Sequence, residues 1–89
     1  MKTIEGFRLR EVCGECVIVP EGRSLVNFNK MISLNESAAF LWKQIEGKEF
    51  TVEQLADLLV GEYGIDRQMA ESDASAVADK WIEVGIVER

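Results

Sequence analysis

Two cysteines with the spacing C-x-x-C are the residues whose types and spacing most readily suggest chemistry. They are Cys13 and Cys16, in the segment EVCGECVIVP. This spacing can supply half of a zinc site or form a reversible disulfide. The chain has no further cysteine and no histidine, so one copy cannot complete a four-ligand site with thiolates and imidazoles. A dimer with two cysteines from each copy remains open.

The elements expected around these cysteines do not favour a redox centre. Reactive C-x-x-C thiols lie at a helix N-terminus, where the helix dipole lowers the thiol pKa. Here residues 7–12 (FRLREV) and 16–20 (CVIVP) have the alternation and β-branched content of strands. We therefore predict a hairpin with Gly14-Glu15 as a two-residue type II′ turn. In it the cysteines are small apolar residues beside a turn, and a thiol or metal module is an alternative.

No other group of residues has the pattern of a catalytic site. Without histidine there is no ordinary catalytic triad. The glycines at 61 and 64 lie at a predicted helix terminus and not in a phosphate-binding loop. Carboxylates such as Glu71 and Asp79 have the spacing of a solvated helix face. The sequence therefore predicts a binding protein that is not an enzyme, with no cofactor and no metal.

Length and charge limit the partners. Eighty-nine residues form a single domain over 1–89, and 10 basic against 16 acidic residues give a formal charge of −6. An acidic chain repels phosphate backbones, so we expect no nucleic acid as partner and favour a basic peptide or protein surface.

The N-terminus lacks the apolar run of a signal peptide, and no stretch approaches the ~18 apolar residues of a membrane span. We expect a cytoplasmic protein with no membrane partner.

The order of elements predicts an α+β domain, in which a three-stranded antiparallel sheet is followed by three helices in a winged-helix-like arrangement. Residues 31–34 are expected to form the third strand. The ends of the helices are marked by capping residues. These are Asn35, Thr51 (with Gln54 in a capping box) and Asp66 before the helices, and Gly47, Gly64 and Gly85 after them. Residues 86–87 can then fold back on a core that includes Trp42 and Trp81.

The winged-helix likeness leaves DNA binding as an alternative. The second and third helices could form a helix-turn-helix, with residues 67–84 as the recognition helix. A helix that reads a DNA groove is normally basic or neutral. Against two basic residues this segment has four acidic ones, a net of −2: Arg67 and Lys80 against Glu71, Asp73, Asp79 and Glu83. The charge therefore disfavours a DNA-binding regulator.

Three segments together resemble the PqqD-like family, named for pyrroloquinoline-quinone biosynthesis protein D. They are FRLREVCGECVIVPEG, MISLNESAAFLWKQIEGKEFTVEQLADLLVGEYGID and DASAVADKWIEVGIVE, and the match spans roughly residues 6–88. The order and spacing of Leu34-Asn35, Leu41-Trp42, the break at Glu46-Gly47 and the TVEQL cap carry the resemblance. The C-x-x-C is not part of the family pattern.

The resemblance implies a recognition element for ribosomally made, modified peptides. Such a domain binds the leader segment of a precursor peptide and presents it to a modifying enzyme, often a radical SAM enzyme. The leader adds as a strand beside the third strand and packs against the third helix, a form of β-augmentation. Carried onto this chain, the expected peptide-binding residues are Met31, Ile32, Ser33 and Leu34 on the strand, and Asp73, Val77, Lys80 and Trp81 on the helix.

Overall fold

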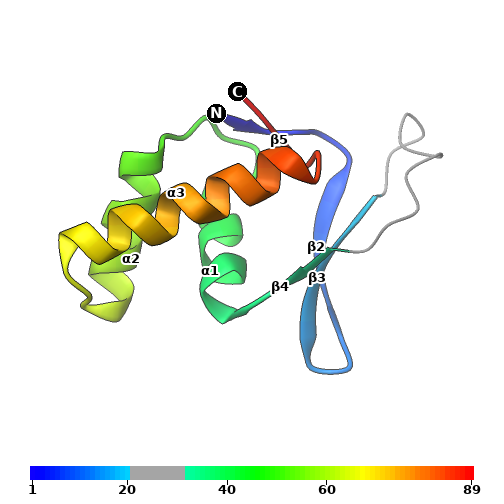
Figure 1. Cartoon of the computed structure of the whole chain (residues 1–89). Coiled ribbons are helices and arrows are strands. Elements are labelled where there is room, and N and C mark those ends of the chain that lie inside the picture. The colour runs from blue at the N-terminus through cyan, green and yellow to red at the C-terminus, as the bar shows by residue number, and fades with distance from the viewer. Residues whose placement is uncertain (21–31) are drawn as a thin grey trace.

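The computed structural model describes residues 1–20 and 32–89. Helices and strands follow one another in the order β1 (Lys2–Thr3), β2 (Phe7–Val12), β3 (Glu15–Pro20), β4 (Ile32–Leu34), α1 (Glu36–Ile45), α2 (Val52–Tyr63), α3 (Arg67–Glu83) and β5 (Val87–Glu88). Strands β2, β3 and β4 form an antiparallel sheet in that order. This sheet lies to one side of the three helices (Figure 1). The predicted α+β fold is confirmed.

A second, two-stranded sheet joins the ends of the described chain and was not predicted. Strand β1 pairs antiparallel with β5, with Thr3 opposite Val87. The two termini therefore lie close together (Figure 1). The expectation that residues 86–87 return to the core is confirmed, because Ile86 and Val87 are both buried. Within the described residues no helix is long and apolar enough to cross a membrane.

The turn between β2 and β3 differs from the prediction. Val12 pairs with Glu15, so the two turn residues are Cys13 and Gly14. Both have positive φ angles, 51° and 82°, which is the signature of a type I′ turn. The predicted type II′ turn at Gly14-Glu15 is wrong, because Glu15 already belongs to the strand. Glycine takes the second turn position, and a cysteine must adopt the left-handed conformation at the first.

The predicted helix starts are confirmed. The side chain of Asn35 accepts a hydrogen bond from the Ala38 amide at 2.8 Å, and that of Asp66 accepts one from the Met69 amide at 2.9 Å. Thr51 and Gln54 form the reciprocal capping box. These bonds satisfy amides that have no partner within the first helical turn. Short polar side chains at the right spacing therefore fix where each helix begins.

The helices are held together by perpendicular aromatic rings and by small residues. Trp42 and Trp81 lie 5.3 Å apart between ring centroids, and Phe50 lies 6.4 Å from Trp81. The indole N–H of Trp42 has no hydrogen-bond partner, so ring contacts and apolar burial stabilise this core. The buried side of α3 consists of Ala70, Ala74, Ala78 and Trp81.

The type I′ turn generates a stability prediction. We expect Cys13→Asn to raise the free energy of unfolding by about 1 kcal/mol, because asparagine tolerates the left-handed conformation better than cysteine does. Urea unfolding followed by circular dichroism measures this change. The control is Cys16→Asn, which lies in a strand and gains no such benefit. A Cys13→Asn variant less stable than the parent would contradict the assigned turn.

Candidate functional site

Strand β4 lies at the end of the three-stranded sheet. On one side it pairs with β3, with Leu34 opposite Cys16, Ser33 opposite Val17 and Ile32 opposite Ile18. No other strand of the described residues pairs with its second side. The backbone groups on that side are therefore open to an added strand.

The hairpin register determines which residue of β4 has its backbone groups on the open side. In an antiparallel ladder, hydrogen-bonded pairs alternate with pairs that exchange no bonds. The turn makes Val12 and Glu15 a bonded pair, since the carbonyl of its first residue accepts from the amide of its fourth. Alternation then directs the backbone groups of Glu15, Val17 and Val19 toward β2. Those of Cys16 and Ile18 point toward β4.

Carrying this alternation across to β4 gives the orientation of its backbone. Leu34 and Ile32 are bonded to Cys16 and Ile18, so their amides and carbonyls face β3. Ser33 is opposite Val17 in a pair that exchanges no bonds. Its amide and carbonyl therefore point outward from the sheet. Among the described residues of β4, Ser33 is the one that offers both a donor and an acceptor at the open edge.

Pro20 provides independent support for this register. It lies opposite Phe7 at the far end of the hairpin. By the same alternation that pair exchanges no hydrogen bonds. A proline has no amide hydrogen to give, so it fits this position without leaving an acceptor of β2 unpaired.

The side chains of β4 divide between the two faces of the sheet. Ile32 and Leu34 are half-buried and pack against the main core, on the same face as the fully buried Ile18. Ser33 is exposed on the other face. The strand therefore combines an open backbone edge with an apolar rim that continues into the core.

Three of the expected α3 residues lie along one flank of that helix. Val77 is half-buried and packs against the core, while Asp73 and Lys80 are exposed. The positions i, i+4 and i+7 place them on one stripe. Arg67, in the first turn of α3, forms an ion pair with Asp57 of α2.

Two expected residues do not lie at the described surface. Trp81 is 2% exposed, and its ring packs against Trp42 and Phe50. It lies beneath the surface residues, where it supports α3. Met31 falls outside the described residues. The remaining expected residues lie at the rim of one core or on its exposed flanks: Ile32, Ser33, Leu34, Asp73, Val77 and Lys80.

A hollow of about 560 Å³ lies at the C-terminal end of β4. It forms where the chain leaves the sheet to begin α1, opposite the β2–β3 turn. Residues 14–16 line one side and residues 33–36 the other. Glu15 and Glu36 both line it. No sequence pattern points to these two residues, because only the strand pairing brings them together.

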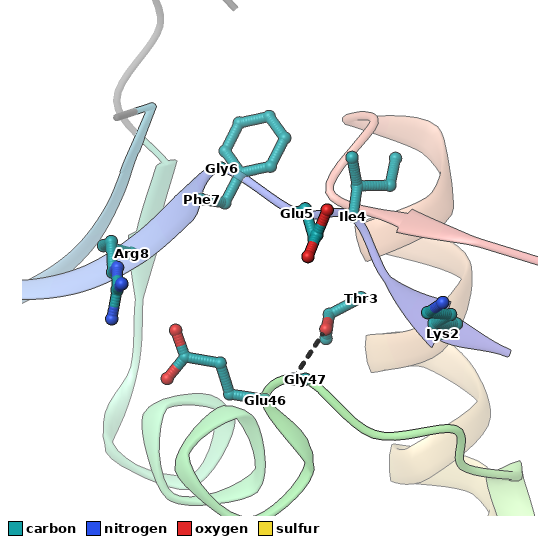
Figure 2. A pocket seen from close by; sticks show the side chains of 9 residues that line it. All are labelled: Lys2, Thr3, Ile4, Glu5, Gly6, Phe7, Arg8, Glu46 and Gly47. Carbon is teal, nitrogen blue, oxygen red and sulfur yellow. Dashed lines mark hydrogen bonds between the residues drawn. The ribbon is translucent and has the colours of Figure 1, made fainter. Parts of the chain in front are cut away.

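A second hollow, of about 720 Å³, lies between the N-terminal segment and the end of α1. In its interior the side-chain oxygen of Thr3 accepts a hydrogen bond from the Gly47 amide at 2.9 Å (Figure 2). Its charged lining residues are of both signs: Lys2, Glu5, Arg8 and Glu46. None of the expected site residues lines it. The hydrogen bond between Thr3 and Gly47 holds β1 against the helical layer.

The two cysteines are free thiols, Cys13 exposed and Cys16 half-buried. In the described part of the chain, no three Cys, Asp or Glu side chains lie close enough together to hold a metal ion. The structure thus gives no positive support to the thiol or metal alternative.

The fold and its open edge define a class of small α+β domain with a strand edge available for pairing, and comparison with known proteins identifies the family. The model of the family described as coenzyme PQQ synthesis protein D matches residues 15–87. The chain belongs to this family. A search of the curated proteins found no match.

Two solved structures share the fold. One is TbiB1 in complex with the TbiA(beta) leader peptide, with a TM-score of 0.77, 18% identity, and coverage of 99% of this chain and 95% of that one. The other is lasso peptide synthetase B1 complexed with the leader peptide, with a TM-score of 0.73, 22% identity, and coverage of 99% and 96%. At these identities the likeness concerns the fold.

The register predicts that proline destabilises the protein much more at position 32 than at the neighbouring position 33. Ile32→Pro removes an amide bonded to β3 and should lower the free energy of unfolding by about 1–3 kcal/mol. Ser33→Pro removes an amide that faces outward, as proline does on edge strands, and should change it by less than about 1 kcal/mol. Urea unfolding of both variants measures the difference. Greater destabilisation by Ser33→Pro would show that the assigned register is wrong.

Proposed function

We propose that this protein is a non-catalytic adaptor that binds the leader segment of a ribosomally synthesised precursor peptide and presents it to a modifying enzyme. The observation that carries the proposal is the open edge of β4, where Ser33 offers both an amide and a carbonyl. Membership of the PqqD family supports it. So do the two structures of the same fold, which are themselves complexes with leader peptides.

The leader would add to the sheet as a further strand beside β4. Its backbone would pair with the outward groups of Ser33, and alternate side chains would face the two sides of the sheet. Those on the core face would extend the apolar rim of Ile32 and Leu34 toward Val77 of α3. Asp73 and Lys80 would form the polar border, and buried Trp81 would hold α3 in place below them.

The chemistry would be performed by a partner. The sequence has no histidine and no catalytic constellation, and the family resemblance implies a modifying enzyme, which we propose to be a radical SAM enzyme of the cytoplasm. The adaptor would then raise the local concentration of the precursor at that enzyme.

DNA binding is the competing function and is disfavoured by charge. Helix α3 has the net charge of −2 counted from the sequence, and its four acidic residues are all exposed: Glu71, Asp73, Asp79 and Glu83. Such a surface repels a phosphate backbone. Electrophoretic mobility shifts at low salt would detect any affinity for DNA.

Binding at the edge of β4 can be tested without knowing the natural precursor. A displayed library of random peptides is selected against the folded protein, and the affinities of enriched peptides are measured by fluorescence anisotropy. We expect Ser33→Pro to weaken binding by about tenfold or more, because it removes the outward donor and places a ring at the edge. Ser33→Ala is the matched control, since it removes the side chain and keeps the backbone donor.

Two results would overturn the proposal. One is a selection that enriches no peptide above an unrelated protein. The other is an enriched peptide that binds Ser33→Pro, shown to be folded, as tightly as the parent.

A further inference from the structure

The C-terminal end of the β4 edge is negatively charged. Glu15 and Glu36 line the hollow of about 560 Å³, and Ser33, whose backbone faces the open edge, lines it as well. The residues around the hollow, 14–16 and 33–36, include no lysine or arginine. A peptide that pairs with Ser33 and continues past Leu34 would therefore meet two carboxylates and no positive charge from this lining.

A pair of aromatic rings begins one helical turn after Glu36. Phe40 of α1 and Tyr63 of α2 stack edge to face with ring centroids 5.9 Å apart. Tyr63 remains 41% exposed. Partial burial and then the negative charges of Glu36 and Glu62 raise the pKa of the Tyr63 phenol. Glu36 lines the hollow, and it lies four residues before Phe40 on α1, which places the two side chains on one face of that helix.

Along the helices, Lys43 is the first basic residue after Phe40, and Arg67 is the first after Tyr63. Lys43 lies one helical turn beyond Phe40 on α1, away from the hollow. Arg67 is engaged by Asp57. We call Glu15, Glu36, Glu62, Phe40 and Tyr63 together the acidic aromatic surface. Carboxylates beside an exposed aromatic ring attract an ammonium or guanidinium group through ion pairing and cation–π contact.

We propose that the peptide bound at β4 carries a lysine or arginine just beyond the residues that pair with Ser33, and that this side chain lies on the acidic aromatic surface. This inference rests on the proposed function, which supplies the bound strand. The surface selects which strand binds. Glu36 is its central residue, because it lines the hollow and lies one helical turn before Phe40, and it acts as a specificity-determining residue.

The experiment uses the same displayed library with the protein and its Glu36 variants. We expect peptides enriched by the parent to carry Lys or Arg at a fixed offset from their apolar positions. Replacement of that residue by Gln should weaken binding by about tenfold. Glu36→Gln should remove the same preference, and Glu36→Lys should shift it toward Asp or Glu. Tyr63→Leu should weaken binding of the basic peptide and leave that of its Gln form unchanged.

The matched control is Glu53→Gln. Glu53 is the acidic residue in the first turn of α2, as Glu36 is in the first turn of α1, so both variants lose one charge and one favourable interaction with a helix dipole. Glu53 lies at the opposite end of α2 from Tyr63. Glu53→Gln should keep the basic preference, and thermal unfolding of both variants checks that they are folded.

The outcomes separate this inference from the proposed function. Peptides that depend on Ser33 but show no basic preference, or a preference that persists in Glu36→Gln, would overturn the inference and leave the adaptor function standing. Peptides that do not depend on Ser33, or no enriched peptide, would overturn both. A basic preference removed by Glu36→Gln and retained by Glu53→Gln would establish the assigned surface.

Discussion

The register of the β2–β3 hairpin is the constraint on which the candidate site depends. The turn at Cys13 and Gly14 fixes Val12 opposite Glu15, and the alternation of the ladder then leaves the backbone of Ser33 facing outward. A slip of one residue would turn Ile18, which is fully buried, onto the opposite face. Burial of the core therefore holds a cysteine in an unfavourable conformation at the turn. The orientation of the open edge is a consequence of the same requirement.

The helical layer offers side-chain contacts in addition to the few backbone hydrogen bonds of the short edge. Strand β4 has three residues, and an added strand gains few backbone hydrogen bonds from it. In the proposed binding mode, side chains beside the edge would therefore provide much of the affinity. The alanines on the buried side of α3 allow close packing, and the perpendicular rings of Trp42 and Trp81 fix its position. In the proposed binding mode, Val77 would then already be in position before a ligand arrives, which would lower the entropy lost on binding.

The sequence predicted the parts that are encoded locally. Asn35, Thr51 and Asp66 mark helix starts because a cap needs only a polar side chain three residues from its amide. The prediction placed the turn one residue too late. It put Gly14 at the first turn position because glycine favours that position in a type II′ turn. The actual position follows from which residues of the strands are buried in the core, which the turn sequence does not reveal. Strands β1 and β5 have two residues each and lie at opposite ends of the chain, so no local pattern identifies them. The resemblance placed Trp81 at the binding face, but its burial depends on ring partners in α1 and at residue 50, which periodicity does not reveal.

The charge of the chain bears on how an open edge can persist. An exposed strand edge pairs readily with any other edge, including that of a second copy. Each copy has a formal charge of −6, and Glu15 and Glu36 concentrate part of that charge beside the end of β4. Two copies approaching edge to edge would repel each other, whereas a strand with a positive charge would be attracted. The same carboxylates can thus oppose self-association and favour a basic peptide, so that an edge that would otherwise promote aggregation becomes selective for its partner.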